Sequence, residues 1–154
     1  MSIKSYIGRR VKPTKGSSEN IKVSDYMSTK LTTFKPEQSV MEVMNTLIRK
    51  KISGGPVVND KNELIGIISE GDCMKQISYS RYYNHPMEDI KVGDHMATDI
   101  ETIDGDMNVF DAADKFLNSR RRRFPIVKEG KLIGLISQKD VLKAAITLKG
   151  NNWK

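Results

Sequence analysis

The sequence contains an internal repeat, and this repeat limits the folds open to the chain more than any other feature. With residue 22 placed over residue 91, Lys22-Val23-x-Asp25-x-Met27-x-Thr29 lies over Lys91-Val92-x-Asp94-x-Met96-x-Thr98. One residue is then lost from the second copy, and Leu64-Ile65-Gly66-x-Ile68-Ser69-x-x-Asp72 lies over Leu132-Ile133-Gly134-x-Ile136-Ser137-x-x-Asp140. A single deletion where a hairpin loop is expected is typical of a duplicated unit. The chain is therefore expected to fold as two similar units.

An amphipathic helix is the clearest element in the first part of each copy. In the first copy Ser39 precedes apolar residues at helical spacing from Val40 to Ile48, and Glu42 completes a capping box. In the second copy Asn108 precedes the equivalent pattern, with Asp111 in the reciprocal position. Helices of this kind bury one face against a sheet or another helix.

Two further apolar runs follow each helix and predict a β-hairpin. Turn-forming residues separate the runs within 56–69 and within 125–137. Short opening strands are expected at 31–34 and 100–103, and a closing helix is clearest over 139–148. Each copy is thus predicted to be a β-α-β-β-α unit of an α+β fold. Because a unit of about 55 residues is near the lower limit for independent folding, the two units should pack sheet to sheet about a pseudo-two-fold axis.

The repeat boundaries divide the chain. We expect a basic flexible tail at 1–20, a first repeat at 21–78, a connector at 79–89, a second repeat at 90–149 and a terminal tail at 150–154.

Composition excludes several protein classes. The one cysteine, Cys73, rules out an intramolecular disulfide framework and favours a reducing compartment. Apolar stretches such as 64–68 are far shorter than the roughly 20 residues of a membrane helix, and the first residues lack the apolar core of a signal peptide. A cytoplasmic protein is expected, with no membrane contact.

The net charge of +7 raises the question of nucleic-acid binding. Most of this charge lies in residues 1–22, next to glycine and serine, which is typical of a mobile arm. Nucleic acid is therefore an unlikely partner. Neither the two histidines nor Cys73 has metal-ligand spacing, and no nucleophilic triad stands out, so an enzyme is not expected.

The paired motifs resemble those of the tandem cystathionine-β-synthase (CBS) domain pair, also called a Bateman module. The resemblance covers roughly 20–149 and rests on Val-x-Asp-x-Met at each start, Pro-hydrophobic-Val after the long helix, and Gly-x-x-Ser-x-x-Asp at the end of each hairpin. It implies a non-catalytic regulatory module that binds AMP, ADP, ATP or S-adenosylmethionine in clefts between the repeats. It also implies a homodimer and a regulated protein partner, which the sequence does not identify.

The resemblance assigns a ribose-binding role to Asp72 and Asp140, with Ser69 and Ser137 beside the sugar and phosphate. The start of a helix also suits a phosphate, because its free N–H groups carry partial positive charge. A second interpretation needs no ligand, since Ser-x-x-Asp at a helix start is also a capping arrangement. Thr33 and Thr102, at the ends of the opening strands, are either nucleotide contacts or ordinary turn residues.

The two copies differ before their hairpin prolines. The first copy has Ser53-Gly54-Gly55, and the second has Arg122-Arg123-Phe124. Ser53 is the candidate ligand contact of the first copy at this place. Arg122 and Arg123 are predicted to neutralise phosphates, and Phe124 to cover an adenine face. Two unequal sites are therefore expected. A solvated arginine cluster at the end of a helix is the other interpretation, and a ligand-free dimerisation or interaction scaffold is the alternative function.

Overall fold

The computed structural model describes residues 21–152, so the predicted tail at 1–20 and the end at 153–154 lie outside the described residues. The first half contains η1 (Val23–Asp25), α2 (Val40–Lys50), β1 (Gly54–Val58), β2 (Leu64–Ser69) and α3 (Glu70–Tyr83). The short helices η2 (Met87–Asp89) and η3 (Val92–Asp94) follow. The second half contains α4 (Val109–Asn118), β3 (Arg123–Lys128), β4 (Lys131–Ser137) and α5 (Gln138–Asn152).

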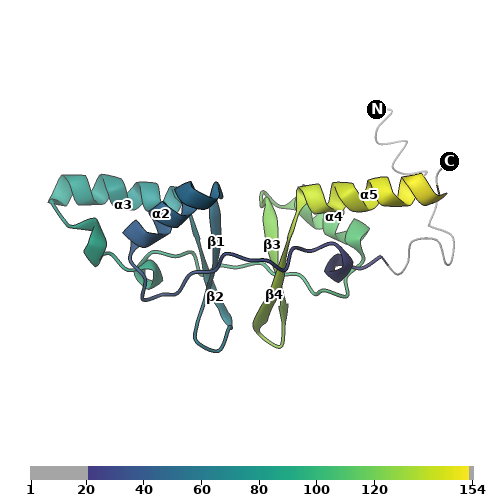
Figure 1. Cartoon of the computed structure of the whole chain (residues 1–154), viewed down its shortest axis with the longest axis horizontal. Coiled ribbons are helices and arrows are strands. Elements are labelled where there is room, and N and C mark those ends of the chain that lie inside the picture. Colours follow the sequence, from purple (N-terminus) through teal and green to yellow (C-terminus); the bar gives the residue numbers. More distant parts are fainter. Residues whose placement is uncertain (1–20, 153–154) are drawn as a thin grey trace.

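The predicted helices and hairpins are confirmed in both halves. Figure 1 shows the two hairpins side by side at the centre, with α2 and α3 on one flank and α4 and α5 on the other. Two closing helices extend beyond their expected limits. Helix α3 continues to Tyr83, so the segment expected as a connector begins inside a helix, and α5 continues to Asn152.

Each hairpin forms a separate two-stranded antiparallel sheet. The opening strands predicted at 31–34 and 100–103 are reduced to single parallel bridges, Phe34 to Val57 and Ile103 to Ile126. Phe34 N donates to Pro56 O at 2.9 Å, and Ile103 N donates to Pro125 O at 3.0 Å. The prediction of full strands was wrong because the preceding residues leave the hairpin and cross to the other half.

The helix caps differ between the halves. Ser39 and Glu42 form the predicted capping box of α2: Glu42 N donates to Ser39 Oγ at 3.1 Å, and Ser39 N donates to Glu42 Oε1 at 3.4 Å. At α4, Asn108 Oδ1 instead accepts from the N–H of Phe110, two residues away, at 2.8 Å. The predicted role of Asp111 is therefore replaced by a shorter turn at the start of α4.

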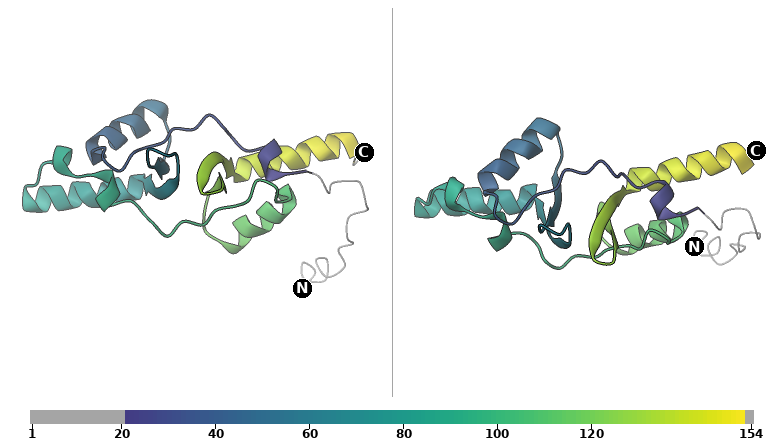
Figure 2. Two further views of the ribbon diagram at one scale, coloured as in Figure 1. Left: turned by 90° about the horizontal axis from the view of Figure 1, so that it is seen from below. Right: turned by 60° about the horizontal axis from the view of Figure 1, so that its bottom comes forward.

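The two halves exchange their leading segments. Val23 N donates to Met107 O and Val92 N donates to Gln38 O, each at 2.8 Å, so each leading segment pairs with the opposite half. Val23 belongs to the core around α4 and β3, whereas Val92 belongs to the core around α2 and β1. Figure 2 shows the two connecting segments, in purple and green, running between the halves. Each repeat therefore completes its core with residues from the other.

Glycine allows the close approach that this exchange requires. A Cβ atom at Gly134 would lie 2.4 Å from Met27 Sδ, and one at Gly66 would lie 2.3 Å from Met96 Sδ. Beside these contacts, Ser28 and Leu135 pair through two backbone hydrogen bonds, of 2.8 and 3.0 Å. The methionine of each start motif thus packs on the glycine of the opposite hairpin.

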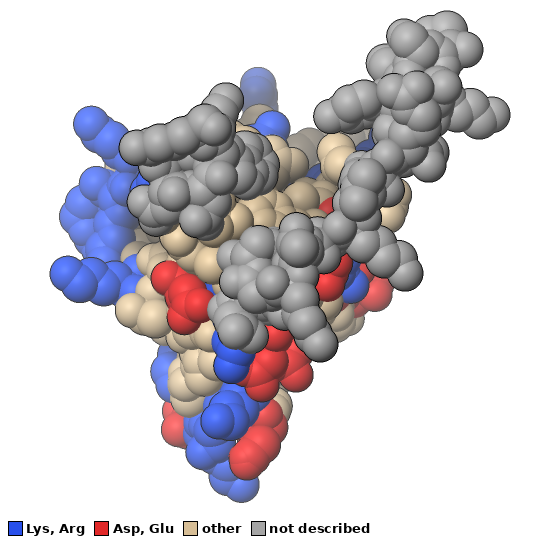
Figure 3. All heavy atoms as spheres, turned by 90° about the vertical axis from the view of Figure 1, so that its right-hand side faces the viewer, with Lys and Arg blue, Asp and Glu red and all other residues tan. Residues whose placement is uncertain are grey.

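The hairpin tips complete the contact between the halves. Leu64 N donates to Gly130 O at 3.1 Å, and Leu132 N donates to Asn62 O at 3.0 Å. The reciprocal pattern agrees with a pseudo-two-fold axis that passes between the hairpins. Figure 3, which views the molecule from the second half, shows basic and acidic side chains mixed at the hairpin end.

Candidate functional site

The first candidate site is a cavity of about 240 Å³ beside the start of α5, here called the Asp140 cavity. Ser137 and Asp140 line it from the second half, and Arg123 lines it from β3. Residues of the segment 28–34, here called the first crossing segment, form another wall. This segment joins the second half at Ser28, through its bridge to Leu135, and the first half at Phe34, through its bridge to Val57. The cavity therefore lies where the two halves meet, and its described lining residues are Ser28, Lys30, Leu31, Thr32, Ile52, Gly54, Arg123, Leu135, Ser137 and Asp140.

Ser137 and Asp140 form the capping arrangement that the sequence allowed. Ser137 N and Ser137 Oγ donate to Asp140 Oδ2 at 2.8 and 3.0 Å, and Asp140 N donates to Ser137 Oγ at 3.3 Å. Ser69 and Asp72 repeat the arrangement at the start of α3, with 3.0 Å for both bonds to Asp72 Oδ2. Since the capping bonds converge on Oδ2, and Asp140 is half-buried in the cavity wall, its Oδ1 is available for a ligand.

A second cavity, of about 400 Å³, lies between the two hairpins and is called the central cavity. Equivalent residues of the two copies line it, such as Pro56 with Pro125 and Ile67 with Leu135. The run 120–123 contributes four arginines to its wall, and Ser69 lies on its first-half side. The central cavity shares Gly54, Arg123 and Leu135 with the Asp140 cavity, so the two spaces adjoin.

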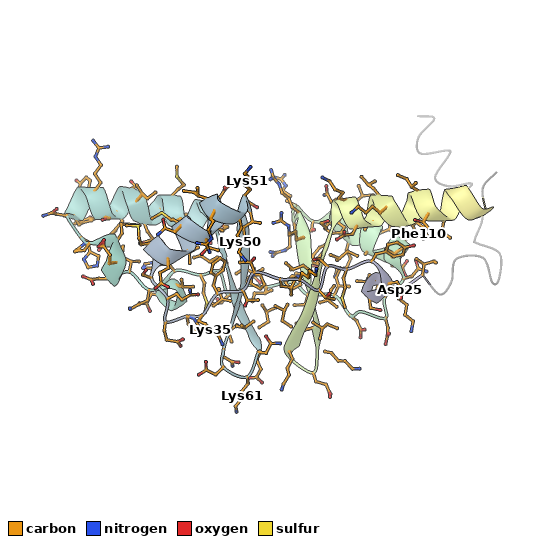
Figure 4. All side chains as sticks on the ribbon, viewed as in Figure 1. Asp25, Lys35, Lys50, Lys51, Lys61 and Phe110 are labelled. Carbon is orange, nitrogen blue, oxygen red and sulfur yellow. The ribbon has the colours of Figure 1, made fainter. Side chains whose placement is uncertain are left out.

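Positive charge is concentrated near this junction. Arg123 Nη1 donates to Ser53 Oγ at 3.2 Å, which joins two predicted site residues from different halves. Arg122 and Arg123 are exposed, and Lys30 adds a further cation to the Asp140 cavity. Figure 4 shows Lys51 near the top of β1, with Lys50 below it at the end of α2. An arginine can hold a phosphate through two parallel hydrogen bonds.

Three predicted site residues, Phe124, Thr33 and Thr102, are not among the described lining residues of the two cavities. Phe124 is fully buried in the second core, with its ring centroid 4.7 Å from that of Phe116. The prediction that Phe124 covers an adenine face was wrong, because the ring packs inside the second core together with Phe116. Thr33 is exposed and its neighbour Thr32 lines the Asp140 cavity instead; Thr102, the counterpart of Thr33, is half-buried.

Several lining residues were missed by sequence reasoning. Leu31 and Thr32 fall in the segment expected only as an opening strand, and Lys30 lies just before it; none of the three was named as a site residue. No local motif marks these residues, because they reach the cavity only through the packing of Met27 on Gly134 in the opposite half. Asp140 and Ser137 line one cavity together, whereas Asp72 is not among the described lining residues of the central cavity.

The family model for the CBS domain matches residues 23–79 and 92–147. The chain belongs to the CBS-domain family. The two matches correspond to the two copies of the repeat, and this confirms the tandem CBS pair inferred from the paired motifs.

Curated relatives of this CBS pair are mostly longer than the chain. An uncharacterized 17.7 kDa protein of Acidianus ambivalens is 32% identical over 126 residues, which are 81% of this chain and 73% of the relative. An uncharacterized protein of Methanocaldococcus jannaschii is 28% identical over 134 residues, or 87% of this chain. The chain spans only 45% of that relative.

Solved structures show the same fold. The CBS-pair protein CBSX2 of Arabidopsis thaliana, in complex with AMP, is 32% identical, with a TM-score of 0.73 over 84% of this chain and 98% of the chain in that structure. The CBS domain pair of the protein MJ0100, in complex with 5′-methylthioadenosine and S-adenosylmethionine, is 23% identical, with a TM-score of 0.66 over 82% of this chain and 96% of that chain. The second likeness supports the fold alone. Within 21–152, no helix is long and apolar enough to cross a bilayer.

Proposed function

We propose that this CBS pair is a non-catalytic regulatory module that binds a phosphorylated adenosine ligand in the Asp140 cavity. The proposal rests on the lining of this cavity. The carboxylate of Asp140 at the start of α5, the cations of Lys30 and Arg123, and the first crossing segment all line the same cavity. AMP, ADP and ATP fit this chemistry best, and S-adenosylmethionine is a further candidate. The AMP complex of CBSX2, at 32% identity, supports the ligand class.

Each part of such a ligand has a chemical counterpart in the cavity. Asp140 Oδ1 is suited to accept hydrogen bonds from a ribose diol, as acidic residues do in other nucleotide folds. Leu31, Ile52 and Leu135 supply apolar surface for an adenine ring. Arg123 stands at the junction with the central cavity, so additional phosphates would extend toward the arginine run at 120–123.

The position of the ligand provides a regulatory mechanism. The first crossing segment is bonded to the second half at Ser28 and to the first half at Phe34, and the ligand would contact residues between these two points. Binding would favour the relative orientation of the halves that fits the ligand best, by its difference in affinity between orientations. A regulated protein partner would recognise that orientation.

Isothermal titration with adenosine, AMP, ADP, ATP and S-adenosylmethionine tests the proposal. Asp140→Ala should weaken AMP binding by about 10- to 100-fold, the usual loss for a hydrogen bond to a charged group. Asp72→Ala is the matched control, because it removes the same capping bonds from α3 without touching the Asp140 cavity. Equal weakening by both substitutions would contradict the ribose assignment. If none of the five compounds binds, the scaffold alternative replaces the ligand proposal.

Arg123→Gln tests the phosphate assignment separately. It should weaken ATP more than AMP and leave adenosine unchanged, because only the phosphates would reach the guanidinium. An equal loss for adenosine would show that Arg123 acts on the nucleoside or on the fold. Leu135→Val, which changes an apolar lining residue on the neighbouring strand β4, should affect adenosine and ATP alike.

We also propose that the chain forms a homodimer through its helical face. Ile48 on α2 and Leu117 on α4 are equivalent residues, and they are 78% and 82% exposed. An apolar groove of about 720 Å³ lies between α2 and α3 beside Ile48. All four long helices lie on one side of the molecule (Figure 1), so a second copy could cover both apolar patches in one symmetric contact. Light scattering should give a dimer for the wild type and a monomer for Ile48→Asp/Leu117→Asp, and a monomeric wild type would overturn this proposal.

A cytoplasmic location remains a proposal that rests on the use of a single cysteine. Localisation of the tagged chain in its own cells would test it.

A further inference from the structure

The two crossing segments carry opposite charge. The second crossing segment, residues 97–103, is the counterpart of residues 28–34 in the repeat. Its Asp99 corresponds to Lys30, and its Glu101 corresponds to Thr32. Ala97 pairs with Ile67 through hydrogen bonds of 2.9 and 2.8 Å, as Ser28 pairs with Leu135. The second crossing segment is therefore placed to line a counterpart of the Asp140 cavity, beside Ser69 and Asp72.

An arginine side chain is bonded along this segment. Arg121 Nε donates to Glu101 Oε1 at 3.3 Å, and Arg121 Nη2 donates to Asp99 O at 3.4 Å. Lys115 Nζ lies 3.0 Å from the other carboxylate oxygen of Glu101. These three charged side chains are each between 33% and 40% exposed, so they form a partly shielded cluster. The hydrogen bond and charge of Lys115, with those of Arg121, lower the pKa of Glu101 and keep its carboxylate ionised.

The counterpart of Arg121 in the first copy is Ile52, which lines the open Asp140 cavity. On the other side, Arg121 and Ser69 line the central cavity, but neither Asp72 nor the second crossing segment is among its described lining residues. The guanidinium of Arg121, which is bonded to Asp99 O and Glu101, therefore lies between the central cavity and the second crossing segment.

We propose that Arg121, held by Glu101 and the Asp99 carbonyl, closes the counterpart cavity at Asp72, so that the chain holds one adenosine ligand and not two. The inference rests on the proposed function of the Asp140 cavity. It identifies Arg121 and Glu101 as the residues that determine the number of ligands per chain. The first copy lacks this closure because the counterparts of Arg121 and Glu101 are Ile52 and Thr32, which are uncharged and cannot form an ion pair.

The test exchanges both residues for their counterparts. Wild type should bind one AMP per chain by isothermal titration, and Arg121→Ile/Glu101→Thr should bind two. Addition of Asp72→Ala to the double variant should weaken the second binding event by about 10- to 100-fold, because the newly opened site would lose its ribose contact. At AMP concentrations that just saturate the Asp140 cavity, the measured stoichiometry should then return to one. Arg121→Ala, which keeps Glu101, is a second variant for use if the double variant does not fold.

Each outcome separates this inference from the proposed function. The closure would be overturned if the wild type binds two AMP molecules per chain. It would also be overturned if the folded double variant and Arg121→Ala still bind only one. Either result would leave the Asp140 site intact. Two sites in the double variant that persist after Asp72→Ala would overturn the assignment of the second site to Asp72. Absence of AMP binding by all of these proteins would overturn both proposals together.

Discussion

The contact between Met27 and Gly134 is expected to be essential for the exchange of leading segments. In Gly134→Ala, the added Cβ would lie 2.4 Å from Met27 Sδ and 3.0 Å from the backbone oxygen of Ser28. The thioether can rotate, but the Ser28 oxygen accepts a hydrogen bond from Leu135 N at 3.0 Å and cannot retreat without loss of that bond. Overpacking of this kind costs about 1–3 kcal/mol of unfolding free energy.

Urea unfolding followed by circular dichroism measures this cost. With a slope of about 2 kcal/mol per M, the midpoint of Gly134→Ala should fall by roughly 0.5–1.5 M. Gly71→Ala is the matched control, since apart from its chain neighbours and the helix backbone the nearest atom to the added Cβ would be Ser69 Oγ, at 3.7 Å. Because alanine is favoured over glycine in a helix, Gly71→Ala should keep or raise the midpoint. A Gly134→Ala midpoint equal to that of the wild type would refute the close-approach argument.

Three further predictions concern single side chains. Ser39→Ala should lower the free energy of unfolding by about 0.5–2 kcal/mol in the same urea assay, because α2 loses its N-cap. The pKa of Glu101 in the folded chain is lowered from 4.5, so its ion pairs should stabilise the fold above pH 4.5, and this stabilisation should be lost as the pH falls further. The difference in melting temperature between wild type and Glu101→Gln should therefore shrink as the pH falls. A constant difference would contradict the ion pairs. Burial, with added repulsion from Asp72 and Glu70, raises the pKa of the Cys73 thiol, so iodoacetamide should label it far more slowly in the folded chain than in urea.

Local patterns predicted the elements of each half well, because helix and hairpin signals depend on nearby residues. Ser39 with Glu42, and the turn residues between apolar runs, act within a few positions of the structure they specify. The destination of a leading segment depends instead on packing between residues far apart in the sequence. Val23 and Val92 look equivalent in the repeat, and only the folded chain shows that each completes the core of the opposite half.

The same distinction explains the result for the candidate site. Asp140 and Ser137 were found because their motif is local and lies at a helix start. Thr32 was missed in favour of Thr33, since a shift of one residue in an extended segment reverses the side that a side chain faces. Phe124 was assigned to a ligand because it follows two arginines, but its ring packs with Phe116 in the second core, a contact with a distant helix that the local motif does not show.

The exchanged leading segments bear on how such a protein could have arisen. A single copy of the repeat, made alone, would lack the residues that complete its core and would have to obtain them from a second molecule. Fusion of two copies in one gene turns that concentration-dependent association into an intramolecular contact, which forms at any dilution. The two copies are then free to diverge at positions such as 52 and 121 while each continues to support the folding of the other.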